Sequence, residues 1–334
     1  MTELDDVVSR LSFTQRIELG PSTDRSLRRG VPAGELERLR RGVFRPRAED
    51  SKRDILSGRE RAERERQHYL DQAVAVMMTR HRMPVLSHYA ALAAWDLPVV
   101  RPWPRVVDLL VGPTSNLRSK NGVRVHRDEY GREDVVEYGG FVLTTPARTI
   151  VDLARDGDFE AAVVALDYAL SGRASSDQLV TKDDVWACLD AMRSSRGRAL
   201  ATKAVEFGNG KSGSPGESVS RIGIHVLGFP APELQVRHPA PNGGHYETDF
   251  EWLEYRQIGE FDGLGKYLKR ELAATSDPGK VVHEEKIRED NLRGEGNGVA
   301  RWGWPEALHL PTLRELLLKA GLPIVRRPVD APHR

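Results

Sequence analysis

The sequence predicts a multi-domain α/β protein, and three observations lead to this fold class. The chain has 334 residues, which is enough for two or three domains with cores of their own. Segments with the apolar period of helices occur along the chain together with short runs typical of strands. A stretch rich in glycine and serine at 208–216 has the composition of a flexible linker. We therefore expect domains at residues 1–50, 51–210 and 211–334.

The first 50 residues have the element order of a winged helix-turn-helix. Apolar residues at helical spacing predict a helix over residues 3–11, and residues 13–19 and 23–29 allow two more helices. Residues 35–45 then predict two short strands that turn at Arg41-Gly42. Three helices followed by a β-hairpin are the plan of a winged helix.

Arginines occur where a winged helix contacts DNA. A recognition helix enters the major groove, and a wing contacts backbone phosphate or the minor groove. A generic solvated basic surface is the alternative, but here the cations coincide with the predicted elements, so we predict DNA binding. The candidate DNA-binding residues in this domain are Arg25, Arg28, Arg29, Arg38, Arg40, Arg41 and Arg45.

The stretch VPAGELERLRRGVF at residues 31–44 resembles the N-terminal winged-helix domain of the abortive-infection AbiEi antitoxin family. The resemblance covers about 50 residues and implies DNA binding, with autoregulation as one form of it. It does not by itself imply an antitoxin role.

The middle region is predicted to be a mixed α+β domain with a structural role. After strands at 105–111, 123–126, 135–136 and 141–143, one long helix is expected, with Thr145 as its N-cap and apolar positions as far as Leu166. The run GGFVLTTPARTIVDLAR within this region resembles the middle part of actinobacterial proteins that combine an AbiEi-type winged helix with a C-terminal nuclease-like domain.

Two histidines of the middle region, His81 and His88, are candidate metal ligands by residue type. No carboxylate or cysteine lies at ligand spacing from them in the sequence. We therefore predict packed or capping histidines.

The C-terminal region contains a predicted β-hairpin at 246–267 that carries several charged residues. Its first strand holds Asp249, its second strand ends with Glu260 and Asp262, and Lys266 follows a Gly-Leu-Gly turn. Carboxylates on adjacent strands with a lysine close behind can hold a divalent cation against a phosphate. Acids that simply face water are the alternative for any single hairpin.

Five short motifs of this region resemble the PD-(D/E)XK nuclease superfamily, in the branch of the very-short-patch-repair endonucleases and the DUF559 family. They are GES at 216–218, TDF at 248–250, GEFDG at 259–263, EKIREDNLR at 285–293 and VARW at 299–302. The resemblance implies a restriction-endonuclease-like α/β sandwich with a mixed sheet.

By position, the resemblance implies that Asp249 and Glu260 bind Mg²⁺ or Mn²⁺, and that Glu217 is the carboxylate on the preceding helix. The superfamily places lysine where this chain has Asp262, so Lys266 is the candidate for a displaced lysine. These five residues are the candidate catalytic group. Lys286 and Arg288 on the following helix are expected to contact phosphate or support the site.

The implied activity is metal-dependent endonucleolytic hydrolysis of DNA, with phage defence as the implied setting. The alternative is an AbiEi-like antitoxin or transcriptional regulator whose nuclease-like domain is not catalytic. DNA is the expected partner in both cases. The sequence leaves open whether the chain forms a homodimer and whether it has a cognate toxin partner.

Composition bears on the partners and on the cellular compartment expected for these functions. The net charge is only +1, yet basic residues outnumber acidic ones between residues 25 and 66. The single cysteine, Cys188, excludes an intrachain disulfide and is typical of a reducing compartment. The N-terminus lacks the pattern of a signal peptide, and no apolar run approaches the roughly 20 residues that cross a bilayer. We expect a cytoplasmic protein without membrane contact.

Overall fold

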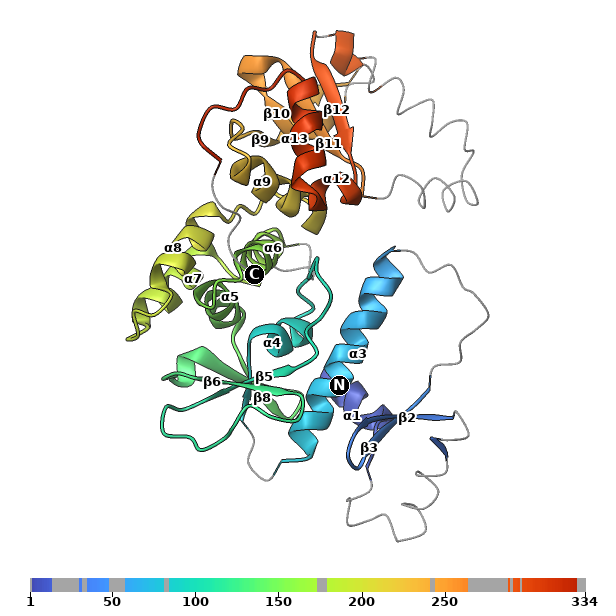
Figure 1. Cartoon of the computed structure of the whole chain (residues 1–334), viewed down its shortest axis with the longest axis vertical. Coiled ribbons are helices and arrows are strands. Elements are labelled where there is room, and N and C mark those ends of the chain that lie inside the picture. Colours follow the sequence, from blue (N-terminus) through green and yellow to red (C-terminus); the bar gives the residue numbers. More distant parts are fainter. Residues whose placement is uncertain are drawn as a thin grey trace. The chain divides into compact units, whose positions relative to one another are not determined.

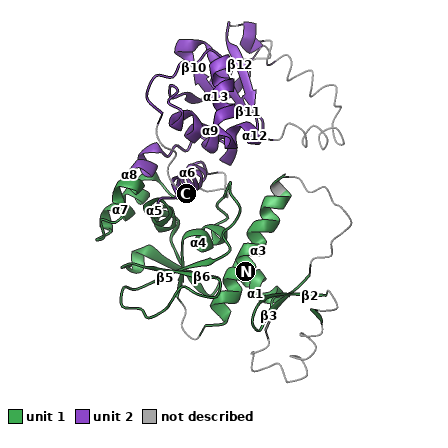
Figure 2. Cartoon of the chain, viewed as in Figure 1, with its two compact units in different colours: residues 1–156, 180–202 green, residues 157–179, 203–334 purple. Residues whose placement is uncertain are grey.

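The computed structural model of the chain describes residues 2–13, 30–31, 35–47, 58–80, 84–172, 179–240, 244–263, 288, 291–294 and 296–328. These residues fall into two compact units, which Figure 2 shows in different colours. Unit 1 comprises residues 1–156 and 180–202, and unit 2 comprises residues 157–179 and 203–334. Both units combine helices with strands, which confirms the predicted multi-domain α/β class (Figure 1).

The start of unit 1 is a short helix and a three-stranded sheet. The helix is α1 (Glu3–Arg10), and the strands are β1 (Ser12–Phe13), β2 (Leu36–Arg40) and β3 (Val43–Pro46), in the order β1-β3-β2. The predicted hairpin is confirmed, and its turn uses Gly42 at φ 81°. The predicted second helix is wrong at its first residue, because Phe13 pairs with Val43 in the sheet. Residues 14–19 of that helix, and the predicted third helix at 23–29, lie outside the described residues.

The N-terminal segment shares its core with the helix that follows, α3 (Gly58–Met78). The Arg66 guanidinium binds Glu3 at 2.6 Å, and Asp71 accepts hydrogen bonds from both Arg10 and Arg45. Leu4, Val7 and Val43 pack in the same apolar cluster as residues of this helix. Residues on both sides of position 50 share this core and belong to the same compact unit, whereas the prediction placed a domain boundary at residue 50.

A five-stranded mixed sheet forms the rest of unit 1, with the order β6-β5-β4-β8-β7. Its strands are β4 (Val85–Leu86), β5 (Val107–Val111), β6 (Val123–Arg127), β7 (Val135–Tyr138) and β8 (Phe141–Thr144). The strands predicted from residue 105 onward are confirmed. Helix α4 (His88–Ala94) packs on β5 and on α5 (Pro146–Arg155), which in turn contacts α7 (Lys182–Ala191).

The long helix predicted after Thr145 is two helices. Thr145 caps the first as expected, since its hydroxyl accepts a hydrogen bond from the Arg148 amide at 3.3 Å. That helix, α5, ends at Arg155, and Gly157 at φ 89° turns the chain. Asp158 then caps α6 (Phe159–Leu170), which belongs to unit 2. An Asp-Gly-Asp sequence breaks the helix because glycine reaches this φ without strain and Asp158 begins a new turn.

Unit 2 contains a four-stranded sheet in the order β12-β11-β10-β9. The strands are β9 (Glu233–Pro239), β10 (His245–Trp252), β11 (Gln257–Phe261) and β12 (Gly298–Trp302). Strands β9, β10 and β11 pair antiparallel, and β12 runs parallel to β11. The predicted hairpin and the predicted strand at 299–302 are both confirmed.

Helices pack on this sheet through an aromatic core. They are α9 (Pro215–Val226), α12 (Trp304–Leu308) and α13 (Leu310–Lys319). Trp302 stacks on Phe250 at 5.4 Å between ring centroids, and its Nε1 donates to the Ser220 hydroxyl at 2.8 Å. One side chain thus joins the sheet to α9. Helix α8 (Arg198–Phe207) spans the point at which the chain passes from unit 1 to unit 2.

The stretch predicted as a flexible linker is tied to α6. The Asn209 amide donates to Asp167 at 2.6 Å, and the Ser212 and Ser218 hydroxyls lie 3.0 Å apart. A Cβ atom on Gly208 would lie 2.2 Å from the Leu166 side chain. The glycines of this stretch therefore permit close packing at that point. None of the helices in the described ranges has the length and apolar character needed to span a bilayer.

Candidate functional site

Glu217 lies in the first turn of α9 and is held by the residues that start this helix. The Ser214 hydroxyl donates to Glu217 Oε1 at 2.9 Å and accepts from the Glu217 amide at 3.3 Å. The Gly213 amide donates to Glu217 Oε2 at 2.6 Å. Ser214 and Pro215 form the predicted start of the helix, and Glu217 as a whole is 8% exposed. These contacts fix the carboxylate, and they also satisfy the helix N-terminus.

Asp249 and Glu260 lie opposite each other on neighbouring strands. The register pairs Phe250 with Gly259, so the residues next to them, Asp249 on β10 and Glu260 on β11, are cross-strand neighbours. The Phe261 amide donates to Asp249 Oδ2 at 2.8 Å. The predicted hairpin thus brings together the two carboxylates that the sequence singled out.

Glu260 is a buried carboxyl group whose charge is unfavourable in this environment. Burial raises its pKa to about 7, with Asp249 adding to the rise and Arg288 and Arg301 opposing it. Arg288 Nη2 donates to Glu260 Oε1 at 2.9 Å. A cation near the two carboxylates is therefore favoured, and Arg288 supplies one.

Gln235, which is not among the predicted site residues, links the helix carboxylate to the strand carboxylate. Its Nε2 lies 3.0 Å from Glu217 Oε2 and 3.5 Å from Asp249 Oδ1. The residue has φ 52°, a left-handed conformation inside β9 that displaces it from regular pairing. Nothing in the local sequence signals this irregularity, since Leu234 and Val236 on either side are ordinary strand residues.

The donor types at Glu217, Asp249 and Glu260 are those that Mg²⁺ binds, because carboxylate oxygens are hard ligands. Within the described residues these three do not form a group whose ligand atoms all lie within 4.8 Å of one another. The Gln235 amide and Arg288 donate to the same carboxylates. The chemistry of the side chains thus suits a divalent cation, and coordination requires these carboxylates to move closer together.

The remaining predicted site residues differ in their relation to these carboxylates. The Asp262 side chain is exposed, and its backbone amide donates to the Trp302 carbonyl at 2.8 Å. Arg288 donates to the Glu247 carbonyl at 2.7 Å as well as to Glu260. Lys266 and Lys286 lie outside the described residues.

The predicted DNA-binding arginines of the hairpin differ in their surroundings. Arg45 is bound to Glu37 at 2.6 Å and to Asp71 at 2.9 Å, so it serves the packing of unit 1. Arg40 Nη1 donates to a backbone carbonyl at 3.0 Å. Arg38 and Arg41 are exposed, the latter at the turn. The arginines predicted for the recognition helix, Arg25, Arg28 and Arg29, lie outside the described residues.

Comparisons with known proteins add no function to this geometry. No known protein-family profile matches the chain. Uncharacterized proteins of Mycobacterium tuberculosis, one from strain CDC 1551 / Oshkosh and one from strain H37Rv, are each 27% identical over 192 residues. The match spans 58% of this chain and 66% of each relative, just under two thirds of their length. The crystal structure of the RV2827C protein from Mycobacterium tuberculosis aligns with a TM-score of 0.37 and 15% identity, over 71% of this chain and 86% of that protein.

Proposed function

We propose that the chain is a DNA-binding protein with a metal-dependent endonuclease site in unit 2, formed by Glu217, Asp249 and Glu260. The observation that carries the proposal is that Asp249 and Glu260 lie on adjacent strands, each next to the paired residues Phe250 and Gly259, and that Gln235 connects Asp249 to the helix carboxylate. Acids that merely faced water would be exposed, whereas Glu217 and Glu260 are 8% and 9% exposed.

The protein groups have distinct tasks in the proposed reaction. When bound, Mg²⁺ or Mn²⁺ supplies an activated water and neutralises phosphate charge. Asp249 and Glu260 hold the cation, and Arg288 keeps Glu260 in place beside its strand neighbour. Gln235 orients Glu217 and Asp249 toward the same region. Lys266 stays the candidate for stabilising charge on the phosphate.

DNA is the proposed substrate because of the basic hairpin in unit 1. Arg38 and Arg41 are exposed there, with Arg38 Nε donating to the Arg40 carbonyl at 3.3 Å, and phosphate is the dominant contact in DNA binding. A DNA-acting protein of this kind would work in the cytoplasm, the compartment that the single cysteine predicts.

The test is cleavage of duplex and single-stranded DNA by the full chain with Mg²⁺ or Mn²⁺. Asp249→Asn and Glu260→Gln preserve side-chain shape and are expected to lower the cleavage rate by at least about 100-fold, because each removes a charged metal ligand. Glu247→Gln is the matched control: this carboxylate is on the same strand, is 39% exposed and pairs with Arg237. Its rate should equal that of the unchanged chain. Absence of cleavage by the unchanged chain, or full activity of Asp249→Asn, refutes the proposal.

A regulator with a non-catalytic nuclease-like domain is the second candidate, and one observation favours it. The Glu217 carboxylate accepts hydrogen bonds from the start of its helix, and Glu260 accepts one from Arg288, so both carboxylates are satisfied by protein donors. Asp262 also stands where the resemblance places a lysine.

Gel-shift titration tests the DNA-binding step that both candidates share. Arg38→Ala with Arg41→Ala should weaken binding and reduce its salt dependence, because two phosphate contacts are lost. Arg193→Ala is the control, since Arg193 is 85% exposed and lies in the same unit. Binding without cleavage supports the regulator. Equal binding by the double variant and the unchanged chain removes this surface from the proposal.

A further inference from the structure

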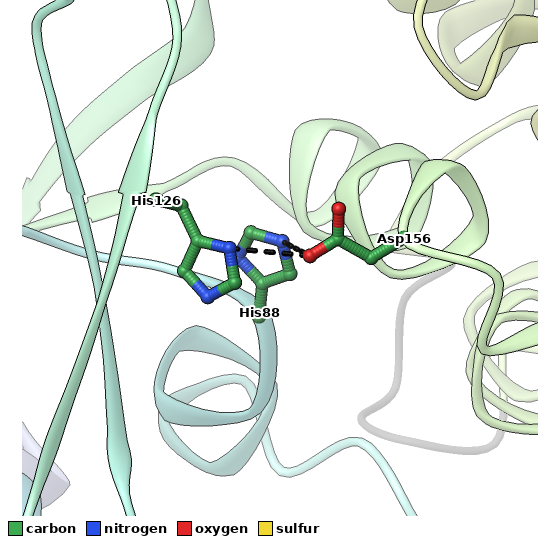
Figure 3. A group of neighbouring side chains, drawn as sticks. All are labelled: His88, His126 and Asp156. Carbon is green, nitrogen blue, oxygen red and sulfur yellow. Dashed lines mark ion pairs between the residues drawn. The ribbon is translucent and has the colours of Figure 1, made fainter. Parts of the chain in front are cut away.

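Two histidines and an aspartate that are far apart in sequence meet in unit 1 (Figure 3). His88 begins α4, His126 lies on β6, and Asp156 follows the last residue of α5. Asp156 Oδ2 lies 3.3 Å from His88 Nε2 and 3.2 Å from His126 Nδ1. One ligand atom from each residue lies within 4.8 Å of the other two.

A second carboxylate fixes the orientation of His126. Asp108 is fully buried on β5, the parallel neighbour of β6, and its Oδ1 lies 2.8 Å from His126 Nε2. A carboxylate only accepts hydrogen bonds, so Nε2 of the ring carries a proton, and in the neutral ring Nδ1 has the lone pair that faces Asp156. Ser87 Oγ lies 3.0 Å from His88 Nδ1, and the other ring nitrogen of His88, Nε2, faces Asp156. A carboxylate behind a histidine ligand is typical of metal sites.

The neutral form of His126 leaves an electrostatic conflict that a cation would remove. Its Nδ1 lone pair and the Asp156 carboxylate oxygen are both acceptors, and they lie 3.2 Å apart. Either a second proton or a metal ion must lie between them.

The two distances to Asp156 are compatible with metal coordination. Charge-assisted N–H···O bonds are about 2.7–2.9 Å long, shorter than both contacts to Asp156. In a tetrahedral zinc site, ligand atoms about 2.0–2.1 Å from the ion lie about 3.3 Å from each other. The imidazole rings stack with centroids 3.6 Å apart and planes at 17°, so coordination requires them to tilt toward Asp156. The χ2 torsion of histidine is soft enough for this change.

The backbone at His88 is a further unusual feature of the cluster. This residue has φ 48°, which is uncommon for a residue other than glycine and costs on the order of 1–3 kcal/mol. Its side chain is nevertheless buried at the start of α4 and directed at Asp156. The strained conformation thus places an imidazole where the other two ligands converge.

We propose that His88, His126 and Asp156 bind one divalent transition-metal ion, with Zn²⁺ as the first candidate. Imidazole nitrogen with carboxylate oxygen suits Zn²⁺ and its first-row neighbours, whereas Mg²⁺ and Ca²⁺ prefer oxygen ligands throughout. The proposed metal site of unit 1 is therefore chemically distinct from the carboxylate site of unit 2. Three protein ligands leave a coordination position for water or a substrate atom.

Titration of the metal-stripped full chain with Zn²⁺, followed by calorimetry, tests the proposal. We expect one equivalent to bind, and Co²⁺ to give the visible absorption of a tetrahedral site with nitrogen ligands. His88→Asn, His126→Asn and Asp156→Asn should each weaken Zn²⁺ binding by about 100-fold or more. Asp108→Asn should weaken it by about 10- to 100-fold, because it removes the partner of a ligand and not a ligand.

His245→Asn is the matched control for this series. His245 is 52% exposed and lies 3.7 Å from a carboxylate of Glu247, so it represents a surface histidine with an acidic neighbour. Its loss should leave the stoichiometry and affinity for Zn²⁺ unchanged. A variant that does not fold is identified by its circular dichroism. For Asp156→Asn, whose side chain is 38% exposed in the unchanged chain, the melting temperature gives a second readout.

Zn²⁺ should raise the melting temperature of the unchanged chain and not that of Asp156→Asn. The proposal is overturned if the unchanged chain binds no Zn²⁺. It is also overturned if the three ligand variants bind one equivalent as tightly as the unchanged chain, or if His245→Asn alone abolishes binding.

Discussion

The buried ion pair between Asp167 on α6 and Arg221 on α9 gives a stability prediction for unit 2. The side chains are 1% and 10% exposed, and the contact is 2.7 Å long. Asp167 also accepts hydrogen bonds from the Ser218 hydroxyl at 2.8 Å and the Asn209 amide at 2.6 Å. Arg221 donates to the Phe207 carbonyl at 2.7 Å and lies 4.1 Å above the Phe207 ring centroid.

Asp167→Asn keeps the shape of this side chain and removes its charge. Breaking a buried ion pair on one side costs about 3–5 kcal/mol, because the remaining charge stays buried without its counterion. Burial raises the pKa of Asp167, and Arg221 only partly offsets that rise, so the ionised carboxylate is itself costly to bury. We therefore expect a loss near the lower end, about 3 kcal/mol, or about 6–12 °C in melting temperature for a unit of roughly 150 residues.

Thermal unfolding of the full chain, with hydrogen exchange of α6 and α9 amides to assign the change to unit 2, measures this loss. The control is Arg237→Ala, which removes an exposed ion pair of the same unit with side chains 69% and 39% exposed. Its cost should not exceed about 0.5 kcal/mol. If Asp167→Asn destabilises the protein no more than Arg237→Ala does, the reasoning about burial is refuted.

Three further predictions concern other parts of the fold. Burial raises the pKa of the Cys188 thiol to about 12. Its alkylation by iodoacetamide at pH 8 should therefore be about a thousand-fold slower than in the urea-unfolded chain and rise about tenfold per pH unit; equal rates contradict this. Gly216→Ala should cost about 1–3 kcal/mol in urea unfolding, since the new Cβ would lie 2.0 Å from the Phe261 ring, whereas Gly58→Ala, which meets nothing within 4 Å, should change stability by less than about 1 kcal/mol. Thr145→Ala should cost about 1 kcal/mol through loss of the α5 cap, with Thr145→Ser retaining most of the stability.

Local patterns in the sequence were sufficient for many elements of the fold. The alternation around Asp249 and the turn after Trp252 identify the hairpin, and Ser214-Pro215 identifies the start of α9. These predictions succeed because strand alternation and helix capping depend on residues within a few positions. The sequence does not reveal the break between α5 and α6, because the apolar period continues across Gly157 and one glycine within such a pattern is an ambiguous signal.

The candidate sites were predicted only in part, because a site depends on contacts between distant segments. The facing positions of Asp249 and Glu260 follow from a hairpin, but the position of Gln235 depends on an irregularity of β9 that has no local cause. His88 and His126 meet across 38 residues of sequence, through the pairing of strands and the packing of α4. A search for ligands at short spacing cannot find such a group.

The passage of the chain between the two units has a practical consequence for anyone who wishes to study either alone. Helix α6 is encoded between segments of unit 1, yet it supplies Asp167 to Arg221 in unit 2. A fragment that starts at residue 211 would keep the carboxylates of the proposed nuclease site and lose this partner of α9. No single cut yields either unit intact, so an inactive C-terminal fragment would report a damaged fold, and activity has to be assayed on the uncut polypeptide.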